Sequence, residues 1–182
     1  MSLMNKSVYD SPVVDADINR HILTILVDNE PGVLARVVGM FSGRGYNIDS
    51  LNVAEVNNQN LSRITIVTHG TREVIDQIQS QLMRIVPVHS VTNLDQEDSS
   101  VEAEVALVNM LIDEQNKKKA FQICDLYRAR KIENENNATI FEIAGTSERI
   151  DAFINDIVKV TKIEIVRSGP VAISSIDKSK ED

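Results

Sequence analysis

The residues best suited to chemistry lie in one stretch, residues 28–48, which reads DNEPGVLARVVGMFSGRGYNI. The stretch passes from the end of an expected strand into a helix with an apolar face. Pro31 fits the first helical position, and Asn29 or Glu30 fits the N-cap. Gly32 follows and has no side chain to cover the unpaired N–H groups. Such a helix start suits a carboxylate, because its N–H groups donate hydrogen bonds and its dipole attracts negative charge.

Neighbouring side chains extend this helix start into a candidate pocket for a small ligand. Asn29 and Asn47 carry amides for the polar atoms of a ligand, and Val33, Leu34 and Ile48 are apolar. Burying a ligand side chain of valine or leucine size there is worth about 1.5–3 kcal/mol, a useful share of a micromolar affinity. Spacing alone favours an ordinary helix start over a ligand site, so both interpretations stay open.

The glycines at the other end of this helix raise the question of a phosphate-binding loop. A dinucleotide fingerprint has its glycines after a strand and at the opening of a helix. Gly43 and Gly45 instead close a helix, where glycine adopts the left-handed conformation of a C-terminal cap. The sequence contains no P-loop motif. We therefore predict that these glycines turn the chain and bind no phosphate.

No other set of residues has the spacing of a catalytic or metal site. The histidines, His21, His69 and His89, stand far apart and in no HxxxH or HExxH pattern. Cys124 falls on the inward stripe of a predicted helix, where a thiol packs as a small hydrophobe. The acidic residues fall on helix exteriors and turns and offer no pair of carboxylates for acid–base catalysis. We predict that the protein is not an enzyme, with no catalytic residues and no metal site.

Charge and composition limit the classes of partner that the protein can bind and the cellular compartments in which it is expected. The chain of 182 residues has 27 acidic and 19 basic residues, a net charge of −8, which argues against a broad nucleic-acid surface. One cysteine permits no internal disulfide, as is typical of a reducing cytoplasm. No apolar run approaches the roughly 20 residues of a transmembrane span, and the N-terminus lacks the apolar region of a signal peptide. We expect a cytoplasmic protein that binds neither nucleic acid nor membrane.

The elements that must position the candidate pocket follow the order βαββαβ. Strands are expected at residues 21–27, 46–56, 61–69 and 86–94, with helices at 32–45 and 71–85 and the hairpin turn NNQN between the second and third strands. The apolar stripe expected to face the sheet on the first helix comprises Val33, Leu34, Val37, Val38, Met40 and Phe41.

The same order returns in the second half of the chain. A shift of 75 residues superposes Gly70-Thr71 on Gly145-Thr146, and each threonine is a predicted helix N-cap. An acidic stretch at residues 95–104, low in bulky residues, reads as the linker region. We predict an α+β fold of two ferredoxin-like βαββαβ modules in tandem, each with two helices on one face of an antiparallel sheet. The expected divisions are a flexible arm at 1–20, a first module at 21–94, a linker at 95–100, a second module at 101–176 and a tail at 177–182.

This arrangement leaves the second face of each sheet uncovered. In the third strand Ile64 and Ile66 fall on one face, with Arg63, Thr65 and Val67 on the other. A module of roughly 75 residues has a modest core, and covering spare faces and edge strands with a second copy stabilises it. We predict a homo-oligomer, at least a dimer.

Three motifs in the first module resemble a known family. They are N-E-x-G-x-L-x-R-V from Asn29, F-x-x-R-G-Y-N-I-x-S-L from Phe41 and L-S-R-x-T-I from Leu61. Together with AGTSERIDAFI and VRSG in the second module, they are similar to the small, regulatory subunit of acetohydroxyacid synthase (acetolactate synthase), whose first module is an ACT domain. The likeness covers about residues 20–172 and is weaker between Val108 and Asn137.

The resemblance implies a non-catalytic subunit. Such subunits bind and activate a large catalytic subunit, which carries thiamine diphosphate, Mg and FAD, and they confer feedback inhibition by valine, leucine or isoleucine, chiefly valine. The large subunit condenses pyruvate with pyruvate or 2-oxobutyrate on the route to these amino acids. This chain itself would hold no cofactor. The alternative is a free-standing amino-acid-sensing ACT protein that acts on a different enzyme or regulator.

The resemblance also assigns the effector site. Asn29, Gly32 and Ala35 belong to the effector-facing turn and helix start, and Asn47 and Ile48 come from the partner chain of an ACT homodimer. Two positions depart from the pattern. Pro31 replaces a small polar residue and Ala35 replaces the serine of some members, and both changes bear on the preference among valine, leucine and isoleucine.

Overall fold

The computed structural model describes residues 17–96, 100–135 and 138–175. The tail predicted at 177–182 and residues 1–16 of the predicted arm lie outside these ranges. The last two residues predicted for the arm, Asn19 and Arg20, are instead the first residues of a strand. Within the described ranges, no helix is long and apolar enough to cross a membrane.

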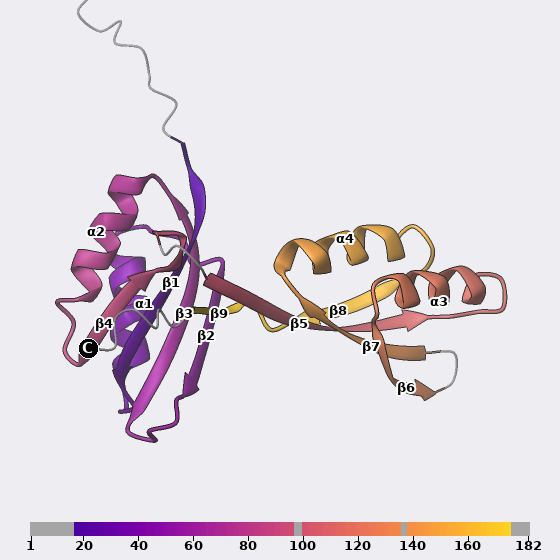
Figure 1. Cartoon of the computed structure of the whole chain (residues 1–182), viewed down its shortest axis with the longest axis horizontal. Helices are drawn as coiled ribbons and strands as arrows, with labels where there is room; N and C mark the ends of the chain where they lie inside the picture. Colours follow the sequence, from indigo (N-terminus) through magenta and orange to yellow (C-terminus); the bar gives the residue numbers. More distant parts are fainter. Residues whose placement is uncertain (1–16, 97–99, 136–137, 176–182) are drawn as a thin grey trace, which may run out of the picture.

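The first module has the predicted βαββαβ order. Its elements are β1 (Asn19–Asp28), α1 (Val33–Gly43), β2 (Ser50–Glu55), β3 (Leu61–Gly70), α2 (Arg72–Leu82) and β4 (Val88–Asn93). The strands form one antiparallel sheet in the order β2-β3-β1-β4, and both helices pack on the same face of it (Figure 1). Strand β2 is therefore at an edge of the sheet.

The core of the first module lies between that face and the two helices. Alternate residues of β1 and β3 point toward the helices, so that Leu23 is opposite Ile66 and Ile25 opposite Ile64, and all four are buried. The helices contribute the remaining large side chains of this core, namely Val33, Val37, Met40, Phe41, Ile75, Ile78 and Leu82. Two of the residues predicted to face the sheet, Leu34 and Val38, do not belong to it.

The second module repeats the plan. Its elements are β5 (Ser100–Leu111), α3 (Lys117–Leu126), β6 (Arg130–Glu135), β7 (Ala138–Gly145), α4 (Ser147–Ile157) and β8 (Ile163–Arg167), followed by β9 (Val171–Ser174). The main strand order is β6-β7-β5-β8. The predicted α+β fold of two ferredoxin-like modules is confirmed.

The internal repeat is visible in the helix starts. The hydroxyl oxygen of Thr71 accepts a hydrogen bond from the backbone N–H of Val74 at 3.5 Å, and Thr146 accepts one from Arg149 at 3.4 Å. Each threonine is thus the N-cap of the second helix of its module, as predicted from the matching Gly-Thr pairs. Side-chain caps of this kind stabilise a helix by roughly 1 kcal/mol.

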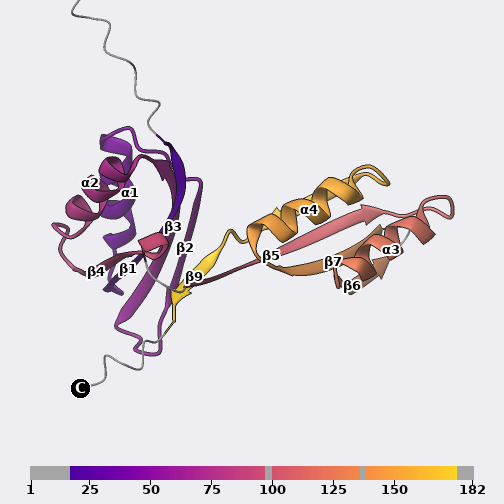
Figure 2. The same cartoon turned by 45° about the horizontal axis from the view of Figure 1, so that its top comes forward.

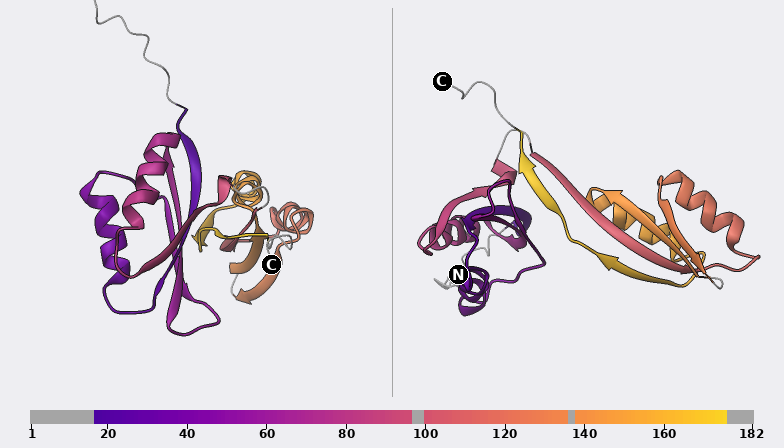
Figure 3. Two further views of the ribbon diagram at one scale, coloured as in Figure 1. Left: turned by 60° about the vertical axis from the view of Figure 1, so that its left-hand side comes forward. Right: turned by 90° about the horizontal axis from the view of Figure 1, so that it is seen from below.

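The connection between the modules differs from the predicted linker. Strand β5 begins at Ser100, so much of the acidic stretch at 95–104 is β-strand. Its first residues, 100–103, pair with β9, which the sequence pattern did not predict. Strand β5 then runs into the second module, and β9 returns beside its beginning (Figures 2 and 3). Backbone hydrogen bonds stabilise this connection, because the two strands form a ladder between the sheets.

The face of the first sheet opposite its helices is partly covered. Ile22 of β1 and Val67 of β3 form a buried cluster there with Leu94, which follows β4, and Ala172 of β9. The prediction that this face is uncovered is therefore wrong at this end of the sheet. Leu94 of the first module supplies part of the cover, and Ala172 of the second module supplies the rest through a strand too short to be recognised from sequence.

Candidate ligand-binding site

The turn before α1 is held against the β2–β3 hairpin by Asn29. Its backbone N–H donates to the carbonyl oxygen of Asn60 at 2.7 Å. Its side-chain Nδ2 donates to Glu55 Oε1 and to the carbonyl oxygen of Gln59, both at 3.0 Å. These contacts use the donor side of the amide, which leaves its exposed Oδ1 for a ligand. The sequence motif indicated Asn29, but Glu55 and Gln59 as its supports emerge only from the fold.

The helix itself begins differently from the prediction. Gly32 is the N-cap, with φ +89° and ψ −9°, and Pro31 precedes the helix instead of starting it. The N–H of Val33 donates to the carbonyl oxygen of Glu30 at 3.4 Å. Proline followed by a left-handed glycine within such a hydrogen bond is a type II turn. The prediction of Asn29 or Glu30 as N-cap is therefore wrong, because the Glu-Pro-Gly-Val sequence closes this turn before the helix starts.

This start leaves hydrogen-bond donors available. The N–H of Val33 is used by the turn, and the N–H of Arg36 donates to Gly32 at 3.1 Å. The N–H groups of Leu34 and Ala35 have no acceptor within the described residues, and no side chain caps the helix. Apart from Gly32 and its two chain neighbours, no described residue has an atom within 4 Å of the point where a Cβ on Gly32 would be. An open helix start with two free donors can bind a carboxylate.

The side chains of the first helical turn divide between core and surface. Val33 was predicted to line the pocket, but it is only 3% exposed and belongs to the core, so it does not face an open pocket. Leu34 is 39% exposed and Val38 36%, while Ala35 is also exposed. Residues 33, 37, 40 and 41 face the sheet, and residues 34 and 38 lie one position further around the helix. The apolar surface available to a ligand is that of Leu34 and Ala35.

The far end of α1 is closed by a glycine, as predicted. Gly45 has φ +71°, and its N–H donates to the carbonyl oxygen of Ser42 at 3.2 Å. The N–H of Tyr46 donates to the carbonyl oxygen of Phe41 at 3.0 Å, and the two rings pack edge to face with centroids 6.3 Å apart. These are the bonds of a Schellman motif. Gly43 is the last helical residue, so only Gly45 needs the left-handed conformation.

The second predicted half of the pocket follows this cap. Asn47 is exposed, and its Nδ2 donates to Asp49 Oδ1 at 2.6 Å. Ile48 is half-buried against the core of the first module. Helix α1 has 11 residues and at 1.5 Å per residue is about 16 Å long. One chain therefore does not bring Asn47 and Ile48 together with Asn29, Leu34 and Ala35, because the two groups lie at opposite ends of the helix.

The remaining candidates for chemistry are engaged elsewhere. His69 Nδ1 lies 2.7 Å from Asp49 Oδ2, and His89 Nε2 lies 2.6 Å from Asp28 Oδ1. Burial raises the pKa of the Cys124 thiol to about 12, so that it is protonated at neutral pH and unsuited to act as a nucleophile. Across the described ranges, no group of three histidine, cysteine or acidic residues could hold a metal ion.

Comparison with known proteins gives this site a context. Residues 23–90 match the family described as an AHAS small subunit-like ACT domain, and residues 103–176 match the family described as the small subunit of acetolactate synthase. The acetolactate synthase isozyme 3 small subunit of Escherichia coli is 41% identical over 160 residues, which are 87% of this chain and 98% of that protein. The chain belongs to the acetolactate synthase small-subunit family. The family predicted from the motifs is confirmed.

Other members of the acetolactate synthase small-subunit family agree over nearly the whole length. The probable small subunit from Archaeoglobus fulgidus is 34% identical over 154 residues, 85% of this chain and 96% of that protein. The crystal structure of the small subunit from Thermotoga maritima has a TM-score of 0.79 at 34% identity and covers 88% of this chain and 99% of that one. The first module is therefore an ACT domain, as predicted.

Proposed function

We propose that the chain is a non-catalytic regulatory subunit of acetolactate synthase. In this proposal it binds the large catalytic subunit, activates it and makes it sensitive to inhibition by valine. The observation that carries the effector part is the open start of α1, where the N–H groups of Leu34 and Ala35 have no acceptor among the described residues. Family membership supports a large subunit as partner.

The effector site is completed by a second copy of the chain. Strand β2 is an edge of its sheet, and a two-fold axis beside it would pair β2 with its copy. This axis also sets the two α1 helices antiparallel. The start of α1 in one chain then lies near the end of α1 in the other, where Asn47 and Ile48 follow. Leu34 and Val38 are exposed apolar side chains on α1, and the same arrangement would cover them.

Each group in this site has a role in binding a branched-chain amino acid. The carboxylate of valine accepts hydrogen bonds from the N–H groups of Leu34 and Ala35, and the helix dipole adds to their effect. The ammonium group donates to Oδ1 of Asn29. The valine side chain packs between Leu34 and the partner's Ile48. Binding across the seam favours one arrangement of the subunits, and linkage carries that preference to the distant catalytic site.

The catalytic chemistry belongs to the large subunit in this proposal. That subunit would carry thiamine diphosphate, Mg and FAD and condense pyruvate. The small subunit contributes no reacting group, in keeping with the protonated thiol of Cys124 and with His69 and His89 held beside aspartates. Both subunits would act in the cytoplasm.

The test combines this chain with its cognate large subunit and measures acetolactate formation with and without L-valine. We expect the chain to raise the rate and valine to lower it again. Valine binding by the isolated chain without any effect on the large subunit would instead favour a free-standing amino-acid sensor. Absence of both stimulation and valine binding would refute the regulatory function.

A further inference from the structure

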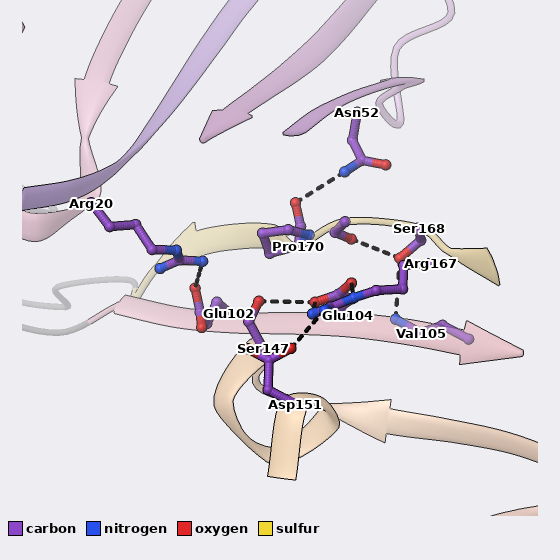
Figure 4. A network of polar contacts seen from close by, with 11 residues as sticks. Arg20, Asn52, Glu102, Glu104, Val105, Ser147, Asp151, Arg167, Ser168 and Pro170 are labelled. Carbon is purple, nitrogen blue, oxygen red and sulfur yellow. Dashed lines mark hydrogen bonds and ion pairs between the residues drawn. The ribbon is translucent and has the colours of Figure 1, made fainter. Parts of the chain in front are cut away.

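A short segment joins the second module to the edge strand of the ACT module. Residues 168–170 connect β8 with β9 and lie beside the outer face of β2 (Figure 4). The segment contacts both modules. Its contacts with each module can therefore transmit a displacement of one module to the other module.

On the side of the second module, the segment is anchored by an ion pair between Arg167 and a buried carboxylate. Arg167 donates from Nε to Glu104 Oε1 at 2.6 Å and from Nη2 to Glu104 Oε2 at 2.8 Å, and the Glu104 side chain is only 1% exposed. Ser147 also donates to Glu104 Oε2 at 2.9 Å. The hydrogen bonds from Arg167 hold the pKa of Glu104 below its usual range. A bidentate pair of this kind fixes the position of Arg167 and of the next residue, Ser168.

Backbone contacts extend this anchor to the segment itself. The N–H of Ser168 donates to the carbonyl oxygen of Val105 at 2.9 Å, and the N–H of Val105 donates to Ser168 Oγ at 3.1 Å. Both bonds join the segment to β5, the long strand of the second module. Residues 167–168 therefore move with that module as one body.

On the side of the ACT module, the segment packs directly against β2. Gly169 has φ +72°, and a Cβ at this position would overlap Ser50 Oγ. Asn52 Nδ2 donates to the carbonyl oxygen of Pro170 at 3.1 Å. Ser50 and Asn52 alternate with Leu51, which packs against the ACT core. A displacement of the first residues of β2 would therefore also displace Gly169 and Pro170.

Ser50 and Asn52 come shortly after Asn47 and Ile48, the residues that this chain contributes to the proposed effector site of its partner. Ser50 comes two residues after Ile48. The N–H of Asp49 donates to Val67 at 2.9 Å, and the hydroxyl of Thr68 donates to the carbonyl oxygen of Asn47 at 2.6 Å. Residues 47–50 thus form a short segment, held to β3 by hydrogen bonds, that connects the effector site with the contact at Gly169.

We propose that Ser50 and Asn52 couple effector binding to the orientation of the second module, through their contacts with Gly169 and Pro170. This inference rests on the proposed function, because it assumes that valine binds beside Asn47 and Ile48. Asn52 and Gly169 act as positioning residues. They do not contact the effector, but they transmit the structural change caused by its binding to the second module.

The test measures valine binding and module orientation separately, in the full chain. Spin labels are placed at Met83→Cys and Leu126→Cys, which are 50% and 74% exposed. The buried native Cys124 stays unlabelled, because its pKa is about 12. Labelled chains are diluted with unlabelled ones, so that the measured distance lies within one chain. Calorimetry with L-valine reports binding to the same samples.

We expect valine to shift the distance in the otherwise native chain by more than about 2 Å, the scale of a domain rearrangement. In Asn52→Ala and Gly169→Ala, valine still binds, with its Kd changed by no more than the free energy of the lost coupling, but the shift is lost. Adding Ser50→Ala to Gly169→Ala removes the overlapping Oγ and leaves the nearest atom at 3.1 Å, the Ser50 Cβ. This double variant recovers the shift at least in part. Ser90→Ala, exposed on β4, is the control and behaves like the native chain.

Two results would overturn the coupling. One is valine binding to the native chain without a change of distance. The other is a normal shift in both Asn52→Ala and Gly169→Ala. In either case the proposed effector site stands, because valine still binds. Failure of the native chain to bind valine refutes the proposed effector site, and the coupling falls with it.

Discussion

At the scale of single residues, two glycines at the ends of α1 have distinct roles. Gly32, at φ +89°, forms the third residue of a type II turn and leaves the helix start open. Gly45, at φ +71°, closes the helix in a Schellman motif. Glycine is favoured at both positions because side chains are strained in the left-handed region. The first role serves ligand binding in our proposal, and the second directs the chain toward Asn47.

The residue-scale prediction concerns Gly32 and Asn47. Gly32→Asp adds a carboxylate where the carboxylate of valine would bind, and Asn47→Ala removes the amide from the partner's half. We expect each variant to need at least about tenfold more valine for inhibition, the effect of losing about 1.4 kcal/mol, while activation of the large subunit stays close to normal. The measurement is acetolactate formation as a function of valine concentration.

The matched control for these variants is Asn19→Ala. Asn19 is exposed at the beginning of β1, and its Nδ2 donates to the backbone carbonyl oxygen of Asp17. It should leave the valine response unchanged. Unchanged valine sensitivity in Gly32→Asp and Asn47→Ala as well would mean that the effector binds elsewhere.

At the scale of elements, the first helix of each module ends in the same cap motif, but the left-handed residue of the cap differs between the modules. Helix α3 closes as α1 does: the N–H of Ala129 donates to the carbonyl oxygen of Cys124 at 2.8 Å, and that of Arg128 to Asp125 at 3.0 Å. The left-handed residue is Gly45 in the first module and Arg128, at φ +51°, in the second. An arginine in this conformation is strained, and the strain is of order 1–2 kcal/mol.

Relief of that strain is the element-scale prediction. Arg128→Gly should raise the free energy of unfolding by about 1 kcal/mol relative to Arg128→Ala, since both remove the same side chain and only glycine relaxes at positive φ. Urea denaturation of both variants measures the difference. Equal stability of the two would show that this helix end carries no strain.

At the scale of the whole molecule, the modules are joined by more than a flexible linker. Strands β5 and β9 pair between them, Ala172 inserts into a cluster with Val67 of the ACT sheet, and Arg20 of β1 bonds Glu102 of β5 at 2.9 Å. Several contacts of different kinds restrict the relative movement of the modules. The edge strand β2 and the exposed face of α1 remain for the second copy in the proposed dimer.

The whole-molecule prediction tests that seam. Val38→Asp introduces a charge on the exposed face of α1, where Val38 is 36% exposed. Burying the charge is unfavourable, so we expect sedimentation to show a larger fraction of monomer and calorimetry to show weaker valine binding, because the monomer has half a site. Leu126→Asp makes the same change at a 74% exposed position on α3 and should alter neither. A fully dimeric Val38→Asp with normal valine affinity would contradict the seam through α1.

Much of the fold was readable because its signals are local. The two helix N-caps, Thr71 and Thr146, the apolar periodicities and the 75-residue repeat each depend on neighbouring residues, and all recur in the structure. The motifs around Asn29 and Gly45 identified the family for the same reason. Local signals were misleading at the start of α1, where the Glu-Pro-Gly-Val turn and a helix beginning with proline have similar sequence patterns.

The sequence by itself determined the two modules and their element order, and it indicated residues for the candidate site. Tertiary structure alone decided which of these residues meet. The four-residue strand β9 pairs with residues about 70 positions earlier in the chain, and such a pairing leaves no local pattern, because its stability comes from the partner strand. In the same way, the burial of Val33, the exposure of Leu34 and the separation of Asn29 from Asn47 follow from how α1 packs on its sheet. Packing fixes the direction of each side chain, and so it decides that one chain holds only half of the proposed pocket at each end of this helix.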